Sequence, residues 1–191
     1  MQENQNISNT PPWREIHTII FDFDGVFTDN IVLVDQDGKE SVSCSRADGY
    51  GFDLLRAFIS LKGWDLDYFI LSTENNSVVS TRANKLKIKS YHGIDNKLDF
   101  IKDYLKKKFP NNSSAQKGCV FFGNDLNDLF SMEYVGFSVA PSDAHPIIKE
   151  VAKLVIQEKG GHGAVRLFIE NLIGIQGKDD AMSILSSSKK N

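Results

Sequence analysis

Three acids follow a short apolar run near the start of the chain, in the stretch IIFDFDGVFTDN from Ile19 to Asn30. Asp22 and Asp24 stand two residues apart, so in an extended backbone their side chains point to the same side. Acids are depleted in strands and are costly to bury without a partner, so packing alone does not explain them. Either these acids cap a turn in water, or they converge on a cation or a reacting group.

Polar side chains also stand where three later apolar runs end. Ser72 and Thr73 follow the second run, Lys97 follows the third, and GNDLND (Gly123–Asp128) follows the fourth. Taken alone, each can be explained without a functional site, as a helix cap, a solvated lysine or a capped turn. Together they place acids, a hydroxyl and a lysine at four successive strand ends, which indicates one site.

The elements that must position these side chains alternate between strand-like and helix-like segments. Short connections between such segments predict a parallel sheet covered by helices on both faces, and ligands bind at the carboxyl ends of its strands. The predicted strands are His17–Phe23, Leu66–Leu71, Lys89–His92, Gly118–Phe122 and Val135–Val139, and the predicted helices are Gly51–Leu61, Ser77–Leu86, Lys97–Phe109 and Leu126–Met132.

One segment departs from this alternation. Residues 31–45 read as two short strands around the turn DQDG (Asp35–Gly38), and a turn that ends in Asp-Gly is a strong hairpin signal. The hairpin falls between the first strand and the first helix, so we expect it to project over the site as a flap. The expected fold is a Rossmann-like α/β parallel sheet with helices on both faces and this hairpin in place of a cap domain.

Length and composition are typical of one soluble globular domain, with 191 residues, 41% hydrophobic and 25% charged. A net charge of −3 gives no reason to expect a nucleic-acid partner, and no apolar run approaches the ~20 residues that span a membrane. Cys44 and Cys119 read as core thiols of a reducing compartment. We expect a cytoplasmic protein with a disordered lead-in (1–14), one domain (15–174) and a loose C-terminal tail (175–191).

Phosphoryl transfer is the chemistry that fits this set of side chains. A carboxylate can attack phosphorus and form an aspartyl-phosphate. Mg²⁺ binds carboxylate oxygens together with substrate phosphate, and so reduces the repulsion between the two anions. Lys97 would add fixed positive charge, and Ser72 a hydrogen bond to a phosphate oxygen.

The ordered set DFDGVFTD, Ser72, Lys97 and GNDLND resembles the four motifs of the haloacid dehalogenase (HAD) superfamily of phosphatases. DGVFTD followed by a hairpin, then ADGYG, GFSVAPSDAHP and GGHGAVRLFIENLI, resembles a small, nearly capless branch of that superfamily. The branch contains phosphatases of 3-deoxy-D-manno-octulosonate 8-phosphate (KDO 8-phosphate) and of nonulosonate (sialic acid) 9-phosphates. The resemblance extends from about Ile16 to Ile173.

The resemblance implies a Mg²⁺-dependent phosphatase and assigns roles to the matching residues. It implies that Asp22 is the nucleophile and a metal ligand. Asp24 is then the general acid and base, which protonates the leaving alcohol and later activates water, while its backbone carbonyl binds the metal. Ser72 and Lys97 would hold the phosphate, and Thr28 would support the loop.

The fourth motif departs from the family pattern at its first acid. The resemblance implies that this loop completes the metal site, with Asp128 in a supporting role. The family usually carries Asp where this chain has Asn124. An amide oxygen still ligates Mg²⁺ with one negative charge less, so either Asn124 or the following Asp125 is the ligand.

The residues expected to select the substrate also depart from the octulosonate pattern. Those enzymes usually carry Gly-Arg where this chain has Thr73 and Glu74, and Glu74 with Lys85 resembles the nonulosonate branch more closely. The family's Arg before Asp-Gly is replaced by Ala47, with Arg46 one residue earlier. A shift by one residue turns a strand side chain to the other face, so whether Arg46 reaches the substrate is open.

The resemblance also implies a homotetramer with shared active sites, in which the hairpin and the glycine-rich segment of a neighbour help close the pocket. Gly160, Gly161 and Gly163 either start the last helix or let the backbone approach a ligand closely. The leading function is release of a sugar acid for surface polysaccharide such as lipopolysaccharide. The alternatives are a phosphatase of another small sugar phosphate and a non-catalytic HAD-like oligomerisation module, which would not need Asp22 or Lys97.

Overall fold

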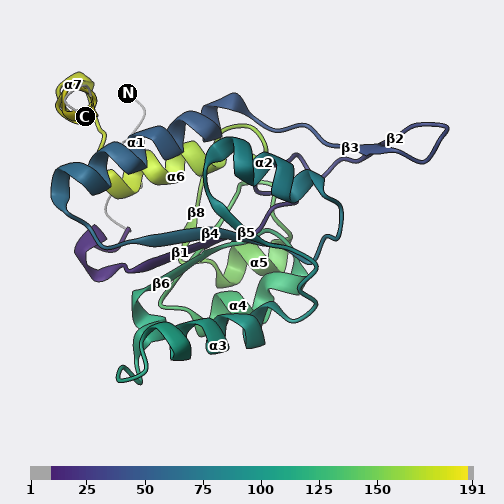
Figure 1. The fold of residues 1–191 in the computed structure, drawn as a ribbon, viewed down its shortest axis with the longest axis horizontal. Helices are drawn as coiled ribbons and strands as arrows, with labels where there is room; N and C mark the ends of the chain where they lie inside the picture. The colour runs from purple at the N-terminus through teal and green to yellow at the C-terminus, as the bar shows by residue number, and fades with distance from the viewer. Residues whose placement is uncertain (1–9, 189–191) are drawn as a thin grey trace.

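The computed structural model describes residues 10–188, and a six-stranded sheet lies at its centre (Figure 1). All neighbouring strands are parallel, in the order β5-β4-β1-β6-β7-β8. The strands are β1 (Thr18–Phe21), β4 (Asp67–Leu71), β5 (Lys89–Tyr91), β6 (Cys119–Phe122), β7 (Phe137–Ala140) and β8 (Leu154–Val155). The predicted parallel α/β fold is confirmed.

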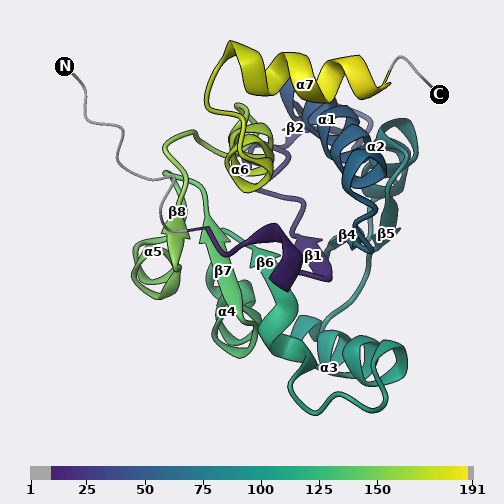
Figure 2. The ribbon, with the colours of Figure 1, turned by 90° about the vertical axis from the view of Figure 1, so that its left-hand side faces the viewer.

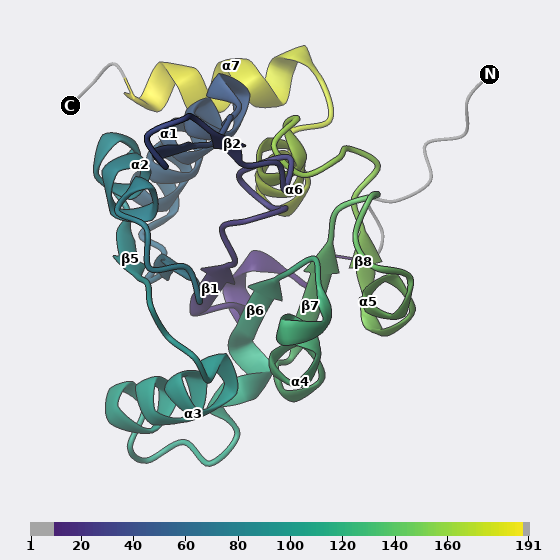
Figure 3. The same cartoon turned by 90° about the vertical axis from the view of Figure 1, so that its right-hand side faces the viewer.

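Helices cover both faces of this sheet (Figures 1 and 3). One layer contains α1 (Arg46–Lys62), α2 (Val78–Leu86) and α6 (Ala164–Ile173), and the other contains α3 (Lys97–Lys108), α4 (Leu129–Tyr134) and α5 (Pro146–Val151). Successive residues of β1 point to opposite faces, so Phe21 joins the apolar cluster of the first layer and Ile20 that of the second. Because both faces are covered, the strands read as continuous apolar runs.

The predicted hairpin is present, and it extends away from the body of the molecule (Figure 1). Its strands are β2 (Leu33–Val34) and β3 (Glu40–Ser41), and the turn between them is closed by a hydrogen bond from the N–H of Gly38 to the carbonyl of Asp35, 3.0 Å long. In β3, beside the turn, the Glu40 carboxylate accepts a hydrogen bond from Nδ2 of Asn76 in the body of the molecule at 3.1 Å. The hairpin is therefore linked to the body through β3, although the residues of both its strands are exposed.

The C-terminal segment is not the loose tail that the sequence suggested. Helix α7 (Lys178–Ser188) packs on α1, as Figure 2 shows, and Ile184 is only 4% exposed. The prediction is wrong over this helix. Its serine-rich composition masks the helical spacing of Ala181, Ile184 and Leu185, which places apolar side chains on one face.

Order also begins earlier than expected at the N-terminal end. Residues 1–9 of the predicted lead-in lie outside the described part of the chain. Trp13 starts a short 3₁₀ turn, η2 (Trp13–Glu15), and its ring lies 5.3 Å from Phe58 and 5.4 Å from Trp64 between centroids. Packing of this tryptophan against α1 therefore orders a segment that composition alone assigned to the lead-in. No helix within residues 10–188 is long and apolar enough to cross a membrane.

Candidate active site

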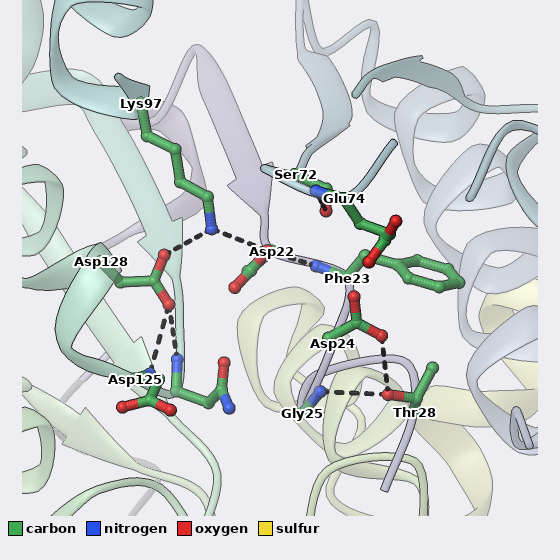
Figure 4. A network of polar contacts seen from close by, with 11 residues as sticks. Asp22, Phe23, Asp24, Gly25, Thr28, Ser72, Glu74, Lys97, Asp125 and Asp128 are labelled. Atoms are coloured by element: carbon green, nitrogen blue, oxygen red, sulfur yellow. Dashed lines mark hydrogen bonds and ion pairs between the residues drawn. The ribbon is translucent and has the colours of Figure 1, made fainter. Parts of the chain in front are cut away.

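The carboxyl ends of β1, β4 and β6 meet at one edge of the sheet, where a cleft of about 330 Å³ opens. Three of the predicted motifs line it directly, and the fourth supplies a lysine buried beneath it (Figure 4). The cleft is lined by Asp22, Asp24, Asn30, Ser72, Thr73, Asn124, Asp125 and Asn127.

A buried lysine joins two carboxylates beneath this cleft. Nζ of Lys97 lies 2.8 Å from Oδ1 of Asp22 and 2.7 Å from Oδ1 of Asp128. The three residues are 2%, 4% and 0% exposed, respectively. Lys97 is the first residue of α3, and its place is set by the helix cap, in which the N–H of Asp99 donates to Oδ1 of Asn96 at 3.1 Å. A solvated lysine is therefore excluded.

Burial and charge act in opposite directions on this trio. Burial raises the pKa of Asp22, the Asp128 carboxylate raises it further, and Lys97 opposes both. Burial alone would lower the pKa of Lys97, but the two carboxylates outweigh that effect and raise it. Lys97 therefore stays charged, and a cation in the cleft would further favour the ionised form of Asp22.

Asp128 also shapes the loop that follows β6. Its Oδ2 accepts hydrogen bonds from the N–H groups of Asn124 at 2.9 Å and Asp125 at 3.4 Å. Its other oxygen binds Lys97. A single buried carboxylate thus fixes the lysine and the loop backbone relative to each other, and Asn124 and Asp125 of this loop line the cleft.

Asn124 leaves an oxygen free for a ligand. Among the described residues its Oδ1 has no hydrogen-bond partner although it is buried, which is costly unless something else supplies the contact. Asp22 and Asp125 line the same cleft. Within residues 10–188 there is no group of three His, Cys, Asp or Glu side chains that could hold a metal ion without other ligands. The donors therefore fit Mg²⁺, which accepts an amide oxygen and retains water or phosphate ligands.

The close approach of the two acidic loops depends on a glycine. Gly25 has φ +73°, and a Cβ at this position would overlap the side chain of Asn124. Any other residue would strain the turn and displace either the loop or the amide. The glycine in DFDGV thus serves both the backbone turn and the packing across the cleft.

Asp24 lies on the other side of Asp22 from Lys97 (Figure 4). Oγ1 of the buried Thr28 donates to Oδ1 of Asp24 at 3.3 Å and accepts from the N–H of Gly25 at 3.1 Å. Burial raises the pKa of Asp24 and the nearby Glu74 carboxylate adds to this, whereas the Thr28 hydrogen bond opposes it. A carboxyl group with a raised pKa holds its proton closer to neutral pH, as a general acid must.

Ser72 supplies a hydroxyl at the end of β4 and is 2% exposed. Its Oγ accepts a hydrogen bond from the N–H of Glu74 at 3.0 Å, and its own N–H donates to the carbonyl of Tyr91. Among the described residues no acceptor binds its hydroxyl proton, which can therefore donate to a ligand in the cleft that Ser72 lines. Asp22, Asp24, Ser72 and Lys97 are thus brought together as the sequence predicted, and their chemical roles are proposed below.

A family model of haloacid dehalogenase-like hydrolases matches residues 66–168. The chain is also 34% identical over 168 residues to the 3-deoxy-D-manno-octulosonate 8-phosphate phosphatase of Escherichia coli (strain K12), covering 87% of this chain and 84% of that protein. The chain belongs to the haloacid dehalogenase-like hydrolases.

Solved structures give the same result for this HAD-like hydrolase. A HAD family hydrolase from Streptomyces avermitilis has a TM-score of 0.76 at 38% identity, over 86% of this chain and 89% of that one. The 3-deoxy-D-manno-octulosonate 8-phosphate phosphatase of Yersinia pestis has a TM-score of 0.73 at 31% identity, over 87% and 84%. The predictions that the chain belongs to this superfamily and that it is an enzyme, a phosphatase, are confirmed.

The predicted substrate residues of this HAD-like hydrolase are separated within one chain. Glu74 extends toward Asp24 in Figure 4, and its Oε1 accepts from the N–H of Asn76 at 2.7 Å. Lys85 is exposed in the last turn of α2, and Arg46 is exposed at the start of α1. Within the described residues neither cation lines the cleft or pairs with Glu74.

Three lining residues were not among the predicted site residues of this HAD-like hydrolase. Thr73 follows Ser72 at the end of the second apolar run, and Asn127 lies within GNDLND, so both stand at strand ends that the sequence marks. Asn30, at the base of the hairpin, has φ +62°; it is the last residue of the stretch IIFDFDGVFTDN, in which only the acids and Thr28 were given roles. None of residues 31–45 lines the cleft, but Glu40 of the hairpin lies near enough to Asp24 for its charge to raise the pKa of that carboxyl group.

Proposed function

We propose that this HAD-like hydrolase is a Mg²⁺-dependent phosphatase of a 3-deoxy-2-ulosonic acid phosphate, either an octulosonate 8-phosphate or a nonulosonate 9-phosphate. The observation that carries the proposal is the Asp22 carboxylate at the end of β1, 2.8 Å from the buried Lys97 and facing a cleft with Asp24 and Ser72. The octulosonate 8-phosphate phosphatases among the relatives support this class of substrate.

The proposed reaction has two displacements at phosphorus. Asp22 attacks in line with the sugar oxygen, so that an aspartyl-phosphate bond forms as the bond from phosphorus to the sugar breaks. Asp24 gives its proton to the departing sugar oxygen, and then takes a proton from the water that attacks the same phosphorus. This second displacement releases inorganic phosphate and returns Asp22 to its starting state. Lys97 and Ser72 hold phosphate oxygens throughout.

A bound Mg²⁺ would supply positive charge between the nucleophile and the phosphate. Its proposed protein ligands are Asp22, the backbone carbonyl of Asp24, and either Asn124 or Asp125. The unpartnered Oδ1 of Asn124 favours the amide over the neighbouring carboxylate. Asp125 instead uses its Oδ1 to accept a hydrogen bond from the N–H of Leu126 at 2.7 Å.

The function is tested by phosphate release from a panel of octulosonate 8-phosphate, nonulosonate 9-phosphates and hexose phosphates, with Mg²⁺ and with a chelator. We expect sugar acid phosphates to be preferred, and all turnover to disappear in chelator while the circular dichroism spectrum persists. Equal turnover of hexose phosphates would favour a phosphatase of another sugar. Absence of turnover on every substrate would favour the non-catalytic module.

Within this class, the acidity of the cleft mouth favours the nine-carbon substrates. Glu74 and Glu40 lie near enough to Asp24 for their charges to raise its pKa, after the larger effect of burial. No Lys or Arg among the described residues lines the cleft. A substrate carboxylate near Glu74 would thus meet like charge, whereas hydroxyl or amine groups of a longer sugar can donate hydrogen bonds to it.

We therefore expect kcat/KM to be higher for a nonulosonate 9-phosphate than for octulosonate 8-phosphate, and Glu74→Ala to reduce that ratio by roughly 5- to 150-fold, the range for one lost polar contact. Glu133→Ala is the control, because it removes the same charge from an exposed position that does not line the cleft. Preference of the wild type for octulosonate 8-phosphate, with a ratio unchanged in Glu74→Ala, would show that Glu74 does not select the substrate.

We also propose the homotetramer implied by the family resemblance, with the hairpin at the interface. Ile31, Val32, Leu33 and Val34 are 59%, 48%, 65% and 63% exposed, a run of apolar residues with no cover in one chain. A two-stranded hairpin is marginal by itself, so packing against other copies would stabilise it. In such an assembly, Lys85 or Arg46 of a neighbour is our candidate for the cation that approaches Glu74.

Sedimentation measures this assembly directly. We expect a tetramer for the wild type and smaller species for Leu33→Asp, because a buried aspartate at the interface would carry an unpaired charge. Met182→Asp is the control, since this exposed methionine (57%) lies on α7, away from the hairpin. A monomeric wild type, or a tetramer that survives Leu33→Asp unchanged, would contradict the proposal.

The cytoplasm is the proposed location, where the released sugar acid would enter the synthesis of surface polysaccharide. The free thiols Cys44 and Cys119 suit a reducing compartment, and Cys119 is fully buried in β6.

A further inference from the structure

The glycine-rich segment Gly160–Gly163 lies against the loop that carries Asp24 in the same chain. The N–H of Gly161 donates to the carbonyl of Val26 at 3.0 Å. A Cβ on Gly160 would overlap the carbonyl oxygen of Gly25, and one on Gly161 would lie 2.5 Å from the nitrogen of Asp29. The neighbours are backbone atoms, which cannot give way as the end of a flexible side chain can.

Two acids from other parts of the fold hold this segment in place. Oδ1 of Asp143, in the loop after β7, accepts from the N–H of Gly160 at 3.0 Å. Oδ1 of the fully buried Asp48, on α1, accepts from the N–H of Arg166 in the first turn of α6 at 3.0 Å. The segment is thus tied at Gly160, where it contacts the loop, and again beyond it, at the start of α6.

The contacted loop is the one that places the proposed general acid. Gly25 and Thr28 form the turn after Asp24, and Thr28 binds both the N–H of Gly25 and the Asp24 carboxylate. A displacement of the Gly25 carbonyl would therefore move the support of Asp24. Asp22 is held separately, by Lys97 and by a hydrogen bond from its own N–H to the carbonyl of Phe122.

We propose that Gly160 and Asp143 are positioning residues, which hold the Gly25–Asp29 loop where Asp24 can protonate the leaving oxygen. This inference rests on the role proposed above for Asp24. The competing explanation is that the glycines serve only to start α6. Gly160 distinguishes the two explanations. Its φ is not in the positive range, so the backbone conformation does not require glycine, whereas an added Cβ would overlap the Gly25 carbonyl of the catalytic loop.

Comparison of two leaving groups tests the proposal. A sugar alkoxide needs a proton as it departs, whereas p-nitrophenolate departs readily without one, so a misplaced general acid affects the first far more. We expect Gly160→Ala to lower kcat/KM for the preferred sugar phosphate on the order of 10²-fold, the loss that a shift of a catalytic group by about 1 Å can cause. For p-nitrophenyl phosphate we expect a much smaller loss. Gly177→Ala is the matched control, because its Cβ would enter open space without positive φ.

A second pair of variants adds no atom at the contact. Asp143→Ala removes the acceptor for Gly160 and should show the same selective loss, while Asp143→Asn keeps an oxygen in that place and should restore most of the activity. Equal losses on both substrates for Gly160→Ala, a result equal to that of Gly177→Ala, or identical behaviour of the two Asp143 variants would overturn the inference. A wild type inactive on all phosphate esters would instead refute the proposed function.

Discussion

Replacement of Asp22 by Asn is expected to leave a folded protein whose phosphatase activity falls roughly 10⁴-fold or more. The amide has the shape of the carboxylate but is a much poorer nucleophile. It also removes a buried negative charge, which limits any loss of stability, and Lys97 keeps its contact with Asp128. Steady-state turnover of the preferred substrate and the unfolding midpoint, measured on the same preparation, check the two parts of this expectation.

Asp29→Asn is the matched control for that variant. Asp29 is the third acid of the same stretch, does not line the cleft, and uses its Oδ1 to accept from the N–H of Ile31 at 3.2 Å. It should retain most of the activity. Substantial turnover by Asp22→Asn, in a sample free of contaminating phosphatase, would eliminate the aspartyl-phosphate mechanism.

Replacement of Lys97 by Met is expected to reduce both activity and stability. The variant would leave the carboxylates of Asp22 and Asp128 buried without their shared cation, and breaking a buried ion pair in this way costs about 3–5 kcal/mol. Turnover should fall as well, because the phosphate loses its fixed positive charge. Denaturant unfolding and kcat measure the two effects.

The double variant Lys97→Met/Asp128→Asn separates stability from chemistry. It removes one of the two unpaired charges, so we expect it to recover part of the unfolding free energy without recovering turnover. Lys106→Met, exposed on the same helix, is the control for loss of a lysine from α3. A wild-type unfolding free energy for Lys97→Met would show that the buried trio does not contribute to stability.

The strand ends of the site were predictable because parallel topology brings the carboxyl ends of strands to one edge. The residues at which helices begin and end were less predictable. Helix α1 begins at Arg46 rather than the predicted Gly51, because Ser45 caps it with a hydrogen bond from the N–H of Ala47 at 3.1 Å. Glycines weaken helices, but a Cβ at Gly51 would lie 3.1 Å from Cα of Arg166, so close packing against α6 requires the glycine there.

Residue type and order along the chain determined which chemistry stands at each strand end: the acids after β1, the hydroxyl after β4, the lysine after β5 and the acidic loop after β6. Only the tertiary structure decided how these groups meet. Asp128 binds Lys97 from 31 residues away, and Asp48 binds the start of α6 from 118 residues away. Lys85, eleven residues after Glu74, is carried to the far end of α2 instead. The physical reason is that periodicity describes which face a side chain takes within its own element, whereas contacts between elements depend on how whole helices and strands pack.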